Sequence, residues 1–180
     1  MAFNVAEFRA NMIGDGARPN LFQVTLAFPS IAANATAAGQ KVTFMAKSAQ
    51  LPGSTVGQVP VYYFGRELKF AGNRTFADWT LQIINDEDFT IRNSIESWMN
   101  AINSHAGNLR NSAAKGPSSY TVDATVTQYG KAGDELKTYK FVGMYPLDLA
   151  PIDLDWGSND TIEEYAVTFA YQWWEANTTN

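Results

Sequence analysis

Apolar and polar residues alternate with a period of two through five separate segments of this 180-residue chain. Successive side chains of a β-strand point to opposite faces, so the pattern is typical of strands with one buried face. The five apolar series are Phe22/Val24/Leu26/Phe28, Val42/Phe44/Ala46, Trp79/Leu81/Ile83, Val122/Ala124/Val126 and Tyr165/Val167/Phe169/Tyr171/Trp173. Shorter strands are expected at Val59–Phe64, Glu67–Ala71, Leu136–Val142 and Leu147–Leu154.

One segment has a helical period instead. Its apolar residues fall at i, i+4, i+7, i+8 and i+11, and they are Ile91, Ile95, Trp98, Met99 and Ile102. This spacing predicts one apolar face of an α-helix over about residues 88–104. Carboxylates at residues 86–88 suit its N-terminus, where backbone N–H groups lack partners. The N-terminal arm is expected to form a second, short helix.

The expected fold is therefore mainly β: an antiparallel β-sandwich or open barrel with one flanking α-helix. Residues 29–40, 48–58 and 107–119 have the composition of surface loops, and none is long enough to separate two domains. We expect one domain over residues 1–180, with an N-terminal arm over 1–17 and a short tail over 175–180. Sheet edges left open in such a fold can join copies of the chain.

Charge and composition exclude several classes of protein. The formal net charge is −5, and no clustered basic face is apparent, which argues against a protein that grips nucleic acid phosphates. An acidic wall could still let DNA slide past. The chain has no cysteine and a single histidine, His105, so thiol catalysis and multi-histidine zinc sites are excluded. Without a secretion signal or a long apolar window, we expect a soluble protein made in the cytoplasm.

Two carboxylates, Asp153 and Asp155, share one face of an extended segment. Such a pair could serve as acid and base in a carbohydrate-active hydrolase, or could bind a divalent cation. The alternative is a solvated strand end that leads into a turn at residues 157–160. The aromatic pair at residues 173 and 174 could similarly be a carbohydrate platform, or could divide between the core and an interface.

Other polar groups are better explained by structure than by chemistry. The acidic run at residues 86–88 could contribute to a metal site, but it fits the N-terminus of the expected helix. His105 follows the C-terminal end of that helix, where a cation is favourable. We therefore expect no catalytic, cofactor-binding or metal-binding residues, and no cofactor.

The segment that begins at Phe70 holds a Gly-Asn pair, one arginine, one aspartate and the two aromatic residues Phe76 and Trp79, and it lies between two expected strands. We interpret it as a tight corner with a turn at residues 72–73. Arg74 and Asp78 flank this corner with opposite charges. They could brace their own sheet or form a contact between subunits, and both alternatives stay open. Either role indicates assembly rather than catalysis.

Five pieces in this order resemble the tail tube protein family of contractile-tailed bacteriophages over residues 17–175. They are Ala17-Arg18-Pro19-Asn20-Leu21-Phe22-Gln23-Val24, Gly72-Asn73-Arg74-Thr75-Phe76-Ala77-Asp78-Trp79, Asn85-Asp86-Glu87, Leu154-Asp155-Trp156 and Val167-Thr168-Phe169. The resemblance implies a structural protein and not an enzyme. Its hexameric rings would stack into the rigid inner tube of a contractile tail.

The same resemblance implies how the protein assembles, which partners it binds and where it is located. Strands of neighbouring subunits would join into one barrel, through which genomic DNA and the tape-measure protein pass without specific binding. The implied partners are further copies of the chain, the tail sheath protein, and the baseplate and tail terminator proteins. The protein would lie in the virion tail and be made in the host cytoplasm. The alternative is the inner tube of a phage-derived contractile injection or secretion system.

We expect the subunit interfaces to use residues from four regions of the chain. The candidates are Arg18, Asn20, Leu51, Pro52, Arg74, Asp78, Trp79 and Trp156. Residues 48–58 are expected to form a long loop that reaches a neighbour in the same or the next ring. Carboxylates are expected to outnumber lysine and arginine on the lumen wall, since a basic wall would retain DNA.

Overall fold

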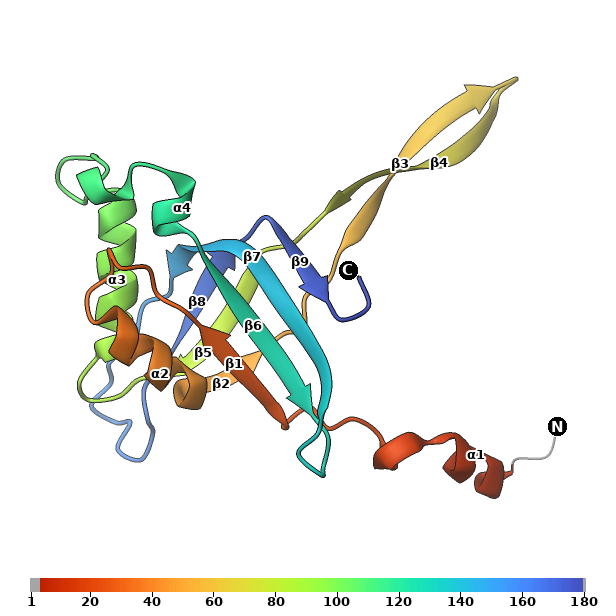
Figure 1. Ribbon diagram of the computed structural model, residues 1–180, viewed down its shortest axis with the longest axis horizontal. Coiled ribbons are helices and arrows are strands. Elements are labelled where there is room, and N and C mark those ends of the chain that lie inside the picture. The colour runs from red at the N-terminus through yellow and green to blue at the C-terminus, as the bar shows by residue number, and fades with distance from the viewer. Residues whose placement is uncertain (1–3, 180) are drawn as a thin grey trace.

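The computed structural model describes residues 4–179, and it has a β-rich body with two extensions (Figure 1). Residues 1–3 of the expected arm and residue 180 of the expected tail lie outside this range. The strands are β1 Phe22–Leu26, β2 Ala46–Ala49, β3 Thr55–Tyr63, β4 Arg66–Thr75, β5 Trp79–Ile84, β6 Val122–Tyr129, β7 Glu135–Leu149, β8 Glu164–Ala170 and β9 Trp173–Ala176. The α-helices are α1 Val5–Asn11, α2 Ala35–Met45, α3 Thr90–Ile102 and α4 Pro117–Tyr120.

Strand β7 joins the two halves of the body. Its first half lies between β6 and β9, which gives the order β1-β6-β7-β9. Its second half pairs with β8, which continues through β5 to β2. The strand changes partners at a bulge around Gly143, whose φ of 65° suits glycine. All these pairings are antiparallel, which confirms the expected fold class.

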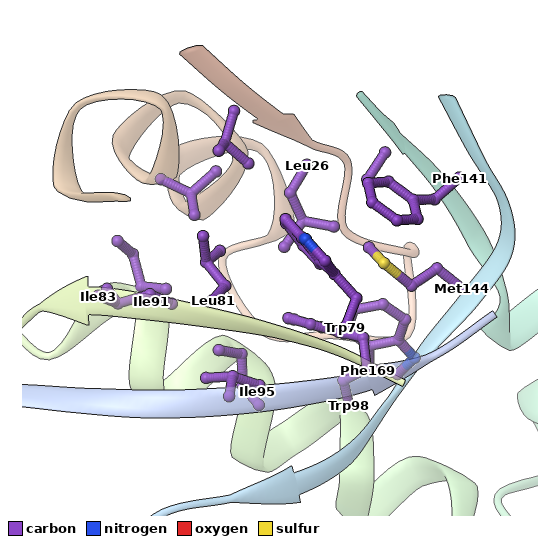
Figure 2. Close-up of a cluster of buried hydrophobic side chains, with 14 of the residues drawn as sticks. Leu26, Trp79, Leu81, Ile83, Ile91, Ile95, Trp98, Phe141, Met144 and Phe169 are labelled. Atoms are coloured by element: carbon purple, nitrogen blue, oxygen red, sulfur yellow. The ribbon is translucent and has the colours of Figure 1, made fainter. Parts of the chain in front are cut away.

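The core lies where the two halves of the sheet and helix α3 meet (Figure 2). Trp79 packs against Phe141 with ring centroids 4.7 Å apart. Trp98 of α3 is fully buried, and its indole Nε1 donates a hydrogen bond of 2.8 Å to the Tyr120 carbonyl. The buried face of α3 is the one that the sequence predicts, so the expected helix is confirmed.

Helix α2 corrects two expectations. Residues 29–40 were expected to form a loop and Val42/Phe44/Ala46 a strand, but Ala35–Met45 is helical. Ala38 and Val42 are buried because residues four apart share one face of a helix, while Phe44 is 82% exposed. The alternation at 42, 44 and 46 covers only three apolar residues. The segment is rich in alanine, which has a high helix propensity, and the helix packs against β1. These two effects outweigh the short strand-like pattern.

Several expected strand and loop boundaries were also wrong. The series 165–173 is interrupted after Ala170, and β9 begins at Trp173, where it pairs with the first half of β7. The expected strand 147–154 ends at Leu149. Residues 55–58 of the expected loop 48–58 belong to β3, and residues 107–119 include two short helical turns.

The expected corner at 70–79 is not a turn at Gly72-Asn73. Strand β4 runs through both residues, and one extra residue on β4 forms a bulge opposite Gly57. The chain leaves the strand only at residues 76–78, immediately before β5. The glycine is therefore explained by the close approach of two strands and not by a reversal of the chain.

Candidate assembly interfaces

Strands β3 and β4 form a two-stranded ribbon that extends away from the body (Figure 1). The turn between them has two residues, Phe64 and Gly65, with φ values of 45° and 76°. Positive φ at both positions matches the tight hairpin turn that suits twisted strands. A two-stranded hairpin is at best marginally stable alone in water, so this ribbon needs a further partner.

The two faces of the ribbon differ in polarity. Cross-strand pairs share one face, which places Val59, Val61, Tyr63, Arg66, Leu68 and Phe70 together. Each of the five apolar members is between 45% and 66% exposed. We call these six residues the ribbon's apolar face. The opposite face is more polar, with Gln58, Pro60, Tyr62, Glu67, Lys69 and Ala71.

The half-sheet β1-β6-β7-β9 ends in two unpaired edges. Strand β1 pairs with β6 and strand β9 pairs with β7, and no strand within residues 4–179 covers the other edge of either. Open edges present unpaired backbone donors and acceptors, which another strand can complete. This four-stranded unit can therefore be extended in both directions by copies of itself.

The side of this half-sheet that faces away from the core is polar. The side chains on it include Gln23, Thr25, Asp123, Thr125, Thr127, Thr138, Lys140 and Glu175. Asp123 accepts an ion-pair contact of 2.8 Å from Lys140, which lowers the pKa of Asp123 and raises the pKa of Lys140. Two carboxylates thus accompany one ammonium group among these residues.

The loop between β7 and β8 presents both acidic and apolar side chains. Leu154 is 82% exposed, Ile162 is 71% exposed, and Trp156 is as exposed as an isolated residue. Asp153 and Asp155 border a hollow of about 350 Å³. In the described part of the chain, neither carboxylate forms an ion pair; Asp155 accepts a hydrogen bond from the Gly157 N–H, as in a turn.

The acidic run at 86–88 is held by a lysine from α2. The Lys41 ammonium contacts the carboxylates of Asp86, at 2.6 Å, and Asp88. The hydrogen bond from Lys41, with a second from the Thr90 N–H, lowers the pKa of Asp88 to about 2. The run therefore anchors α2 to the start of α3, and it lies at the N-terminal end of α3, as the sequence predicts. His105 is exposed beyond the helix end.

The predicted interface residues fall into different environments. Arg18, Asn20, Leu51, Arg74, Asp78 and Trp156 are exposed, and Pro52 is half-buried. Trp79 is only 3% exposed within one subunit, and its indole nitrogen donates to the Gln50 carbonyl. No ion pair joins Arg74 to Asp78 in residues 4–179, so the structure does not supply the intra-chain brace between them.

Phe64 is the most exposed apolar residue of the ribbon, 92% exposed at its tip, and it was not predicted as a contact residue. A signal was present: two strand-like segments separated by a very short link that contains a glycine. The N-terminal arm was predicted correctly as a short helix. Its apolar residues Val5, Phe8 and Met12 are all exposed.

Comparison with known proteins decides the family. Residues 17–177 match the profile described as "Phage tail tube protein". The chain belongs to the phage tail tube protein family. It is 35% identical over 168 residues to the tail tube protein gp19 of Enterobacteria phage T4, covering 93% of this chain and 96% of that protein. It is 30% identical to a tail tube protein of Serratia phage KSP90, covering 93% of both chains.

Solved structures of contractile injection systems share the fold of this tail tube protein. A chain from the tube-terminating cap of the anti-feeding prophage aligns with a TM-score of 0.65 and 17% identity, covering 98% of both chains. A chain from the PVC sheath–tube complex in its extended state aligns with a TM-score of 0.58 and 15% identity, covering 97% of this chain and 98% of the other. Chains of contractile injection systems thus share the fold of this tail tube protein.

Proposed function

We propose that this tail tube protein closes into hexameric rings through the two open edges of its four-stranded half-sheet. Strand β1 of one subunit would lie beside β9 of the next, which would merge the half-sheets into one continuous barrel. One observation supports this proposal: within the described residues, neither β1 nor β9 has a partner strand on its outer edge. A head-to-tail contact of this type forms a ring when the rotation closes.

The polar side of the same half-sheet would line the lumen. Its threonines and its two carboxylates against one ammonium group make a neutral to slightly acidic wall. Such a wall would let genomic DNA and the tape-measure protein pass without retaining them, because it offers no basic track for phosphates. The helix α3 lies on the opposite side of the body from this surface (Figure 1).

Stacked rings would form the tube, with the ribbon β3–β4 reaching the adjacent ring. We propose the ribbon, and not the expected loop 48–58, as the segment that contacts the adjacent ring, because most of the exposed apolar residues of this region lie after residue 58. Arg18, Asn20, Leu51, Pro52, Arg74, Asp78 and Trp156 remain proposed contact residues. The sheath, baseplate and tail terminator proteins would bind the outside and ends of the tube, within the virion tail and after synthesis in the host cytoplasm.

Negative-stain electron microscopy of the purified protein, with two-dimensional class averages, tests the ring. Six-fold rings or tubes are the expected result. A population of monomers alone, at high concentration and with the other tail proteins added, would contradict the proposal. Cryo-microscopy of a tube would also locate the wall: a lumen lined by α3 or by clustered lysine and arginine would refute the assignment of the half-sheet.

The inner tube of a contractile injection system is the second candidate, because chains of such particles share this fold. Particles purified from the native source distinguish the two. A DNA-filled capsid attached to the tail would indicate a phage, whereas tails without any capsid gene nearby would indicate an injection system. A hydrolase that uses Asp153 and Asp155 has no comparable support, since the relatives are structural proteins.

A further inference from the structure

We propose that the ribbon's apolar face of one subunit docks on the loop at residues 150–163 of a second copy in the adjacent ring. This inference rests on the proposed function and names the surface that receives the ribbon. For this docking, the two surfaces must be complementary in polarity and charge. The ribbon of one subunit must also be unable to reach the loop of the same subunit.

The ribbon contributes apolar side chains in a cationic setting. Residues 55–75 contain Arg66, Lys69 and Arg74 against the single carboxylate of Glu67, which gives a net charge of +2. Arg66 is the one charged member of the ribbon's apolar face. No ion pair engages these three cations within residues 4–179, so their charges are available to a partner.

The receiving loop has the opposite charge and a similar apolar content. Residues 150–163 hold four carboxylates and no lysine or arginine; indeed, the chain has no cation after Lys140. Leu154, Trp156 and Ile162 project between these acidic residues and are largely exposed. Exposed apolar side chains that gather in one contiguous patch mark an interaction site. A partner surface that is apolar and cationic would complement this loop.

The two surfaces lie at opposite ends of the molecule. In Figure 1 the ribbon extends to the upper right, and the light-blue loop that follows β7 lies at the lower left, beside the β5–α3 connection. One subunit therefore cannot fold its ribbon onto its own loop. A contact between opposite ends is heterologous, so it repeats from copy to copy and builds an open stack when its rotation does not close. Ring stacking requires this type of contact.

Charge exchange tests the pairing. One variant carries R66E on the ribbon's apolar face, a second carries D155K on the loop, and a third carries both substitutions. All the changes are on exposed side chains, and circular dichroism with thermal unfolding confirms the fold of each. The expected result is that the first two variants form single rings but lose tubes at least tenfold by sedimentation, while the combined variant recovers them. Lys115→Glu, in a separate exposed loop, controls for net charge and should keep tubes.

The outcomes separate the inference from the function on which it rests. Tubes that form equally well from both separate variants would overturn the docking surface and leave the ring proposal intact. Rings that stack in neither the separate nor the combined variants would also overturn the pairing. Loss of sheath binding by the loop variant, with tubes unchanged, would assign the loop to the sheath instead. If the wild-type protein forms no rings, the proposed function itself fails.

Discussion

Gly57 of β3 and Gly72 of β4 face each other at the base of the ribbon, so closely that a β-carbon on Gly72 would lie 3.1 Å from the carbonyl carbon of Gly57. The atoms it would meet belong to the backbone and cannot rotate away. This contact lets the bulge turn the ribbon away from the body. The two glycines thus make room for the bulge near the base of the ribbon.

Replacing Gly72 with alanine is expected to open the base of the ribbon. Because the clash is with the opposite strand, amide hydrogen exchange in residues 55–75 should become faster, while the thermal unfolding of the body changes little. Gly53→Ala is the control, since a β-carbon at Gly53 meets nothing within 4 Å. Equal exchange rates in the two variants would show that the close approach does not constrain the ribbon.

Replacing Phe64 with a residue that tolerates its backbone conformation should stabilise the turn at the ribbon tip. Phe64 has a φ of 45°, and a bulky residue in this left-handed region costs about 1 kcal/mol or more. Phe64→Asn should therefore stabilise the turn by about 1 kcal/mol, because asparagine tolerates this backbone. Slower exchange of the ribbon amides, together with weaker tube formation, is the expected combination.

Tyr63→Asn is the matched control for the tip. Tyr63 contacts the Phe64 ring, with centroids 4.6 Å apart, but lies in the extended part of β3. This change removes the same ring contact without relieving the backbone, so exchange should become faster. If both asparagine variants slowed exchange alike, the backbone of Phe64 would not be the cause.

Acid should weaken the anchor between α2 and α3. The pKa of Asp88 is about 2, below its ordinary value, so its ion pair stabilises the folded state above about pH 4. This contribution is lost as the pH falls through the folded pKa. Chemical unfolding between pH 2 and 6 should show a smaller acid-dependent loss for Asp88→Asn than for the wild type. Asp160→Asn, which removes a carboxylate that forms no ion pair within residues 4–179, should keep the wild-type slope; an unchanged slope in Asp88→Asn would contradict the prediction.

The core position of Trp98 gives a direct stability test. Trp98→Phe leaves a cavity beside Phe169 and removes the donor to the Tyr120 carbonyl, so we expect a loss of about 1–3 kcal/mol in the free energy of unfolding. Trp156→Phe is the counterpart on an exposed indole and should change stability by less than about 0.5 kcal/mol. Urea unfolding of both variants makes the comparison, and similar losses would contradict the assigned burial.

The sequence predicted long periodic elements well and short ones poorly. Helix α3 and strands β5 and β6 were found because each has one buried face along its length. Helix α2 was missed because its burial involves only Ala38 and Val42, too few residues to establish a period. Trp79 and Trp156 were both chosen as contact residues, yet one is buried and the other fully exposed. The identity of a residue as tryptophan therefore does not predict whether it is buried in the core or exposed on the surface.

By itself, the sequence determined the fold class, the family and the absence of cysteine chemistry, because these depend on periodicity, ordered motifs and composition. Only the tertiary structure decided that β1 and β9 end the same half-sheet with open edges, and that 55–75 is a free ribbon. The tertiary structure also places the ribbon and the loop at residues 150–163 at opposite ends of the molecule. The physical reason is that strand order and direction arise from pairings between distant segments, which no local pattern records.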